Sequence, residues 1–155
     1  MALPSILMRG VAVLIFVCFL TGCGDKGDEF RDINARTVTL PDGAAIHAEV
    51  KADRQSQAIG MMYRDSLPDG RGMLFVYRAP MREAYWMHNC KIPLDIVWLD
   101  AARKVVEVVP NAPPCRKPAQ ECPAYGGHQA AQYVLELGGG QAKAHHVEPG
   151  KVLEF

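Results

Sequence analysis

The chain has 155 residues, of which 17 are Lys or Arg and 17 are Asp or Glu, so its formal net charge is zero. This length is enough for one domain with its own hydrophobic core. The balanced charge argues against nucleic acid as a partner, because nucleic-acid-binding domains usually carry a basic patch or a high pI.

The first 22 residues have the pattern of a secretory signal peptide. Arg9 is their only charge, and an apolar run covers residues 11–20. This run is too short for a membrane-spanning helix, which needs about 20 residues. A positive start, a short apolar run and small residues before a cleavage point are typical of export. We therefore expect residues 1–22 to be removed.

The residues at the expected cleavage point, Leu20-Thr21-Gly22-Cys23, resemble the lipobox of bacterial lipoproteins. The resemblance implies cleavage before Cys23 and lipid attached to its sulfur, which would hold the protein on the periplasmic side of a membrane in the cell envelope. An ordinary signal peptide followed by an incidental cysteine is the alternative. By the sorting habit of some Gram-negative lipoproteins, Gly24 rather than aspartate after Cys23 favours the outer membrane. Residues 23–34 are interpreted as a lipidated flexible tether.

Export changes how the remaining cysteines are interpreted, because disulfides form and persist in oxidising compartments. Cys115 and Cys122 lie in a proline-rich stretch, and we predict that they pair. With about eight residues in the closed loop, the chain-entropy model gives about 2.5 kcal/mol of stabilisation. A metal pair is the alternative, although the spacing exceeds that of most zinc-binding cysteines. Cys90 is then the odd thiol and is expected to be buried.

The part from residue 35 to residue 155 begins with a hairpin signal. Residues 37–40 and 46–50 alternate in hydropathy on either side of Pro41-Asp42-Gly43, which has turn chemistry. Asp53 can cap a helix, which the spacing of apolar residues predicts over residues 54–63.

The rest of the chain predicts further short strands. A long loop is expected over residues 110–129 and a short helix over residues 141–146. The predicted strands cover residues 73–77, 83–89, 94–99, 104–109, 133–137 and 152–155. About eight short strands with one or two short helices indicate a compact β-rich α+β domain, with a partly closed barrel as one arrangement.

The strand over residues 94–99 has two mostly apolar faces and is expected to be central in a sheet. Asp95 interrupts one of these faces, and a buried carboxylate is costly unless it is paired or hydrogen-bonded. One interpretation makes it the polar floor of a ligand pocket built from Trp86, His88, Asn89 and Asp95. The other makes it a structural clamp that accepts backbone N–H groups across the turn at residues 91–93.

Several segments resemble, in the same order, the DUF192 family. They are residues 60–64, 72–76, 85–90, 92–96, 122–125 and 133–137. The resemblance covers residues 35–155 and implies a compact β-rich domain that is often exported, but it supplies no reaction. The usual central motif of the family is Trp-Met-Lys-Asn-Thr, in which His88 and Cys90 here replace Lys and Thr. Gly150-Lys151 likewise replaces a usual Gly-Asp, so roles that rest on those residues do not carry over.

Two kinds of chemistry are compatible with the central motif. Cys90, His88 and Asp95 could form a cysteine-nucleophile site, since residues 88 and 90 would share one face of an extended strand. Alternatively, the soft donors of the region select Cu(I). These are Met73, Met81, Met87, His88 and Cys90. Methionine in a strand is, however, a common core filler.

The sequence leads to three functional hypotheses. The first is a non-catalytic envelope module, without a cofactor, that binds a small ligand or an envelope protein. The second is a copper-handling protein, and the third is an enzyme that depends on the Cys90 thiol. No nucleic-acid partner is expected, and the lipid anchor supplies the contact with the membrane.

Overall fold

The computed structural model of the protein describes residues 34–155, so the predicted signal peptide, Cys23 and residues 24–33 of the tether lie outside the described residues. The strands are β1 (Ala35–Thr39), β2 (Ala45–Lys51), β3 (Arg71–Met81), β4 (Tyr85–Trp86), β5 (Leu94–Leu99), β6 (Val105–Ala112), β7 (Ala124–Tyr125) and β8 (Ala131–Gly138). The helices are α1 (Arg54–Ile59), the 3₁₀ helix η2 (Ala119–Glu121) and α2 (Gln141–Ala144). The predicted β-rich α+β fold is confirmed. None of the helices in this part of the chain is long and apolar enough to cross a membrane.

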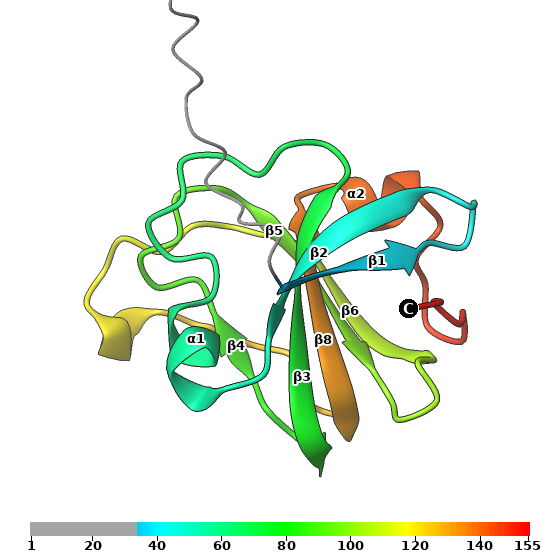
Figure 1. Cartoon of the computed structure of the whole chain (residues 1–155). Helices are drawn as coiled ribbons and strands as arrows, with labels where there is room; N and C mark the ends of the chain where they lie inside the picture. The colour runs from blue at the N-terminus through cyan, green and yellow to red at the C-terminus, as the bar shows by residue number, and fades with distance from the viewer. Residues whose placement is uncertain (1–33) are drawn as a thin grey trace, which may run out of the picture.

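Six strands form one sheet in the order β1-β2-β3-β8-β5-β6, and β4 pairs with β7 in a separate two-stranded sheet. Strands β2 and β3 are parallel, whereas the other neighbours in the large sheet are antiparallel. Figure 1 shows β3 and β8 side by side through the middle of the molecule. Over residues 34–155 the sheet is open, with β1 and β6 at its edges, and does not close into a complete barrel.

The predicted hairpin is confirmed, with Val38 opposite Ile46 in the β1–β2 pair. The Asp42 carboxylate accepts the backbone N–H of Ala44 at 3.0 Å, which closes the turn locally. Gly43 has a φ of 88°, a left-handed conformation that favours glycine at this position.

The parallel pair β2–β3 requires a crossover connection, and this connection contains α1. Asp53 caps the helix as predicted, since its carboxylate accepts the backbone N–H of Ser56 at 2.9 Å. The helix ends at Ile59 rather than at residue 63, because Gly60 turns to a positive φ of 48° and Met61 folds into the core. The crossover therefore places a single short helix beside β3.

The large sheet separates two hydrophobic clusters, one on each face. The first lies on the side of α2 and contains Val38, Leu40, Ile46, Ala48, Leu74, Val97, Leu99, Val105, Leu135, Leu137, Ala142, Val147 and Leu153. The second, called cluster 2 below, contains Met61, Met73, Phe75, Met87, Cys90, Leu94, Ile96, Trp98, Ala112, Cys115, Ala131 and Val134. All six residues of β5 are buried between β8 and β6, so this strand is central as predicted. Figure 1 shows α1 and α2 at opposite sides of the sheet.

Three predicted elements differ from the structure. Only Tyr85–Trp86 of residues 83–89 forms a strand, because Asn89 adopts a positive φ of 57° and the chain turns there. The predicted loop at residues 110–129 contains the end of β6, η2 and the two-residue strand β7. Residues 152–155 make single bridges to two different places, Val152 to Lys104 and Glu154 to Thr39, instead of a regular strand.

Candidate functional site

A cleft of about 1100 Å³ lies on the cluster 2 side of the sheet. Its walls come from α1 and the turn after it, from the second half of β3, and from residues 83–86. Most of its lining is apolar or aromatic: Ala52, Ala58, Ile59, Met61, Met62, Phe75, Val76, Tyr77, Ala79, Pro80, Met81, Ala84, Tyr85, Trp86 and Cys90. Ile59, Met81 and Trp86 are exposed large apolar side chains, with 51%, 40% and 45% of their surface accessible. A concave, mostly apolar surface of this size is typical of small-molecule sites.

Glu136 is the buried polar group of this cleft. It lies on β8 between Met73 of β3 and Ile96 of β5, and only 4% of its surface is accessible. Its Oε2 atom has no hydrogen-bond partner among residues 34–155. Burial raises the pKa of this carboxyl to about 8, and the positive charge of Arg64 opposes that rise only in part. Glu136 is therefore mostly protonated at neutral pH.

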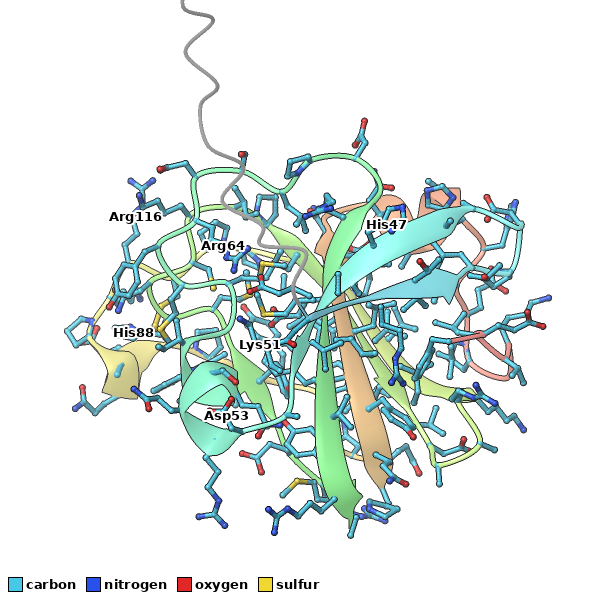
Figure 2. The ribbon with its side chains drawn as sticks, in the orientation of Figure 1. His47, Lys51, Asp53, Arg64, His88 and Arg116 are labelled. Atoms are coloured by element: carbon cyan, nitrogen blue, oxygen red, sulfur yellow. A yellow bond between two sulfur atoms is a disulfide. The ribbon has the colours of Figure 1, made fainter. Side chains whose placement is uncertain are left out.

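Arg64 is held by a different carboxylate. Its guanidinium and the ammonium group of Lys51, both labelled in Figure 2, each donate to Glu49 at 2.6 Å. Burial of Glu49 opposes its ionisation, but these two hydrogen bonds and charges outweigh burial and lower its pKa. Arg64 thus forms a hydrogen bond with Glu49, whereas it acts on Glu136 through the attraction of its charge.

Two tyrosines add polar groups to the cleft wall. The hydroxyl oxygens of Tyr77 and Tyr85 lie 2.7 Å apart, and the Tyr85 ring packs edge-on against Phe75 and Trp98. Burial is the main cause of the raised pKa of both phenols, and the charges of Glu83 and Glu136 raise it further. Both phenols are neutral at physiological pH and can donate or accept hydrogen bonds.

Side chains from distant parts of the sequence hold the walls in place. The Gln57 side-chain amide donates to the carbonyls of Lys51 and Val76 at 3.1 and 3.0 Å, which ties α1 to the sheet. On the other wall, Trp98 Nε1 donates to the Glu83 carbonyl at 3.0 Å. Gly126 lies directly against the Trp98 ring, where an added Cβ would overlap the ring atoms. The cleft therefore has a wall that is packed rather than loose.

The structure brings three of the four predicted pocket residues close together. The rings of Trp86 and His88 are 5.4 Å apart, and the Asn89 side chain donates to the Tyr63 hydroxyl at 2.9 Å. His88 Nδ1 lies 3.2 Å from the Lys117 carbonyl oxygen. Figure 2 shows His88 at the outside of the molecule beside η2. Of these residues, Trp86 lines the cleft.

Asp95 lies apart from these three residues, on the opposite face of the sheet. Its Oδ1 accepts backbone N–H groups from Asn111 at 2.6 Å and Gly140 at 3.0 Å, and its Oδ2 accepts that of Ala142 at 2.6 Å. The clamp is thus present, but the donors are not those of the turn at residues 91–93. The reason is that the first N–H groups of α2 have no partner within the helix and lie next to β5.

The predicted disulfide between Cys115 and Cys122 is confirmed. Cys90 is the free cysteine of the described part and is buried, as expected. Burial raises the pKa of its thiol to about 12, so the thiolate needed for nucleophilic attack is scarce at neutral pH. The premise that residues 88 and 90 share a strand face was wrong, since Cys90 N–H closes a turn onto the Met87 carbonyl at 3.1 Å.

The proposed soft-metal donors are divided between two environments. Met73, Met87 and Cys90 are buried in cluster 2, whereas Met81 is exposed and His88 faces the disulfide loop. Within residues 34–155, no group of three or more His, Cys, Asp or Glu side chains is placed to hold a metal ion.

Comparison with known proteins assigns the chain to a family. The model of DUF192, described as an uncharacterized ACR, matches residues 37–155. The chain belongs to the DUF192 family. It is similar to a protein of unknown function from Novosphingobium aromaticivorans DSM 12444, with 30% identity, a TM-score of 0.70, and coverage of 78% of this chain and 85% of that one. It is also similar to a proposed transcription regulator from Sinorhizobium meliloti 1021, with 28% identity, a TM-score of 0.66, and coverage of 76% and 89%. No curated protein matches.

Glu136 was not among the functional residues predicted from the sequence of this DUF192 domain. A signal for it existed, because the residue stands between Leu135 and Leu137 in the strand predicted at residues 133–137. Alternation along that strand places Val134 and Glu136 on one face, which is the same argument that singled out Asp95. What the sequence did not indicate is that this face borders a cleft.

Proposed function

We propose that this DUF192 protein is a lipid-anchored envelope protein that binds a small, largely apolar ligand in the cleft and does not act as an enzyme. The observation that carries the binding proposal is the apolar cleft with Glu136, a buried carboxyl without a hydrogen-bond partner in the described residues, at its floor. Buried polar groups in native proteins nearly always have partners, so this carboxyl points to a group that is supplied from outside.

The ionisation of the tyrosine and cysteine side chains of the cleft argues against their use as nucleophiles or general bases. A nucleophile or general base needs a pKa near the working pH or below it. Tyr77 and Tyr85 have raised pKa values, and the pKa of Cys90 is raised to about 12. These groups suit hydrogen bonding and packing instead. One similar protein is described as a transcription regulator, but this chain has equal numbers of basic and acidic residues. It therefore lacks the basic excess that is usual in domains that bind nucleic acid.

Native mass spectrometry of the full chain, purified from cells after export, tests the binding proposal. The native mass should exceed the denatured mass by that of an organic molecule. Ala58 is exposed on α1 and lines the cleft, so Ala58→Trp should fill the space and remove the extra mass. Ala102→Trp, in an exposed turn outside the cleft, is the control and should retain it. An extra mass equal to copper would support the metal-handling hypothesis instead.

The lipid anchor is proposed from residues 1–23, in which an apolar run precedes Leu20-Thr21-Gly22-Cys23. More than one acyl chain on a single cysteine would give stable membrane attachment. Cys23→Ala in the full chain should abolish the lipid-modified N-terminal peptide in mass spectrometry. Cys18→Ala, five residues earlier within the apolar run, is the matched control and should still be lipidated. An unmodified mature N-terminus in the wild-type protein would contradict the proposal.

A further inference from the structure

We propose that the cleft is a site for organic cations, in which the ammonium group of an apolar amine forms an ion pair with Glu136. The carbon skeleton of the amine would lie against Met61, Phe75 and Trp86. This inference rests on the proposed binding function and names the chemical class of its ligand.

The position of Glu136 is the first argument. Its strand, β8, lies between β3 and β5 in the large sheet, and the cross-strand neighbours on its face are Met73 and Ile96. Neither neighbour can donate a hydrogen bond to it. Since Glu136 also lines the cleft, a ligand bound there would lie beside it.

Among residues 34–155, no charged or titratable group forms a hydrogen bond with Glu136 Oε2. Arg64, from the turn after α1, attracts the carboxylate but makes its hydrogen bond with Glu49. The nearby groups from β3, β4 and the turn after it are neutral: Tyr77, Tyr85 and Cys90. The exposed lining carries charges of both signs, from Asp53, Glu83, Arg54 and Arg78. Arg71 begins β3 on the same sheet face as Glu136.

The chemistry of the walls distinguishes a cation from other ligands. At the exposed part of the lining Arg54 and Arg78 would attract an anionic group, but at the buried carboxyl the ionised form of Glu136 would repel it. A neutral carbonyl or amide would gain a hydrogen bond between uncharged partners. An ammonium group would gain a charge-assisted hydrogen bond, which is roughly twice as strong. It would also gain attraction to the aromatic rings that line the cleft, because ring faces attract cations. Phe75, Tyr85 and Trp86 supply these rings.

The affinity for an organic cation should depend on pH in a way that distinguishes it from a neutral ligand. A cation binds the ionised carboxylate, whereas a neutral acceptor binds the protonated carboxyl. Between pH 7 and pH 9 the Glu136 carboxyl, with a pKa of about 8, changes from mostly protonated to mostly ionised. In that interval Tyr77, Tyr85 and Cys90 stay neutral. Alkylammonium groups resemble lysine, whose pKa is about 10.4, and remain charged.

The test is a calorimetric titration of the full chain, held in phospholipid discs, with hexylammonium, hexanamide and hexanol as probes. Empty discs correct for partitioning into lipid. Hexylammonium should bind most tightly, and its affinity should rise about tenfold from pH 7 to pH 9, following the ionised fraction of Glu136. Glu136→Gln should remove both the preference and the pH dependence. Glu107→Gln, which alters a carboxylate of β6 that does not line the cleft, should change neither.

The outcomes separate the two proposals. If hexanamide binds more tightly and weakens as the pH rises, or if Glu136→Gln keeps the hexylammonium affinity, the cation site is refuted while a binding cleft remains. If none of the three probes binds above the empty-disc blank, the binding function is refuted as well.

A second measurement tests the cation site in the wild-type protein, so it does not depend on whether the Glu136→Gln variant folds. The ¹³C chemical shift of the Glu136 carboxyl can be followed against pH in the wild-type chain. Saturating hexylammonium should lower the pKa of this group from about 8 to below about 7. An unchanged or higher pKa would overturn the proposal.

Discussion

The carboxylate of Asp95 accepts the backbone N–H of Ala142 at 2.6 Å, which joins β5 to α2 across 47 positions of the sequence. Two further N–H groups, from Asn111 and Gly140, complete its coordination. Three separate segments therefore meet at one carboxylate on the face of the sheet opposite the cleft.

Asp95→Asn should destabilise the protein by about 3 kcal/mol, because an amide NH₂ would face backbone donors and the charge-assisted hydrogen bonds would be lost. The free energy of unfolding in urea measures this. Asp100→Asn is the matched control, since Asp100 also accepts two backbone N–H groups, from Ala102 and Lys104, but lies in an exposed turn. Its cost should be about 1 kcal/mol or less. Equal costs at the two positions would argue against the clamp.

Glu136 should make the protein less stable as the pH rises. A glutamic acid in the unfolded chain ionises near pH 4.5, whereas burial raises the pKa of Glu136 to about 8 in the folded protein. Between these values the folded protein holds a proton that the unfolded chain has released, so raising the pH favours unfolding. Above pH 8 both states are ionised and the loss is complete, on the order of 5 kcal/mol.

Urea unfolding at intervals from pH 5 to pH 9 checks this dependence. The Glu136→Gln variant has no carboxyl to ionise at this position and should be more stable than the wild-type protein at pH 9. Glu107→Gln controls for a carboxylate that bonds to His128 away from the cleft, and its curve should keep the wild-type slope. Parallel curves for the wild type and Glu136→Gln would show that this carboxyl is ionised or paired in the folded state.

Cys90 should be almost inert towards alkylating reagents while the protein is folded. Burial raises the pKa of its thiol to about 12 from an ordinary value of 9.0, which lowers the thiolate fraction at pH 8 about a thousandfold. Iodoacetamide labelling followed by peptide mass spectrometry gives the rate, with the protein unfolded in urea as the reference. Labelling at the same rate in both states would revive the cysteine-nucleophile hypothesis.

Gly126→Ala should unfold or deform the wall of the cleft. Its φ of 63° disfavours any side chain, and an added Cβ would overlap the Trp98 ring, so we expect a loss of about 3 kcal/mol. Gly43→Ala is the control, because Gly43 also has a positive φ of 88° but no atom lies within 4 Å of an added Cβ. That variant should lose about 1 kcal/mol from backbone strain alone. Thermal unfolding separates the two effects, and similar losses would mean that the contact with Trp98 is not tight.

The local features of this protein were readable from its sequence. Alternation and turn residues predicted the β1–β2 hairpin, Asp53 was correctly placed as a helix cap, and the two apolar faces of residues 94–99 identified a central strand. The pairing of Cys115 with Cys122 could also be predicted. Each of these depends on neighbours within a few residues, or on a pattern that repeats along one segment, so the information is local.

The partners of distant groups could not be predicted in the same way. Sequence reasoning recognised that Asp95 needed hydrogen bonds but chose nearby donors, whereas the donors come from Asn111, Gly140 and Ala142. It grouped Asp95 with Trp86 because both lie near the central motif. Strand alternation sends Asp95 to the opposite face of the sheet from the cleft.

The cleft itself was decided by tertiary structure. Residues from α1, β3, β4 and β8 form it only after the parallel β2–β3 crossover has set α1 beside the sheet. The sequence by itself determined that Glu136 is a lone acid on an apolar strand. Only the packing of these elements decided that this carboxyl is buried beside the cleft and that its Oε2 atom has no hydrogen-bond partner among residues 34–155. Burial and hydrogen bonding depend on the position of every neighbouring segment.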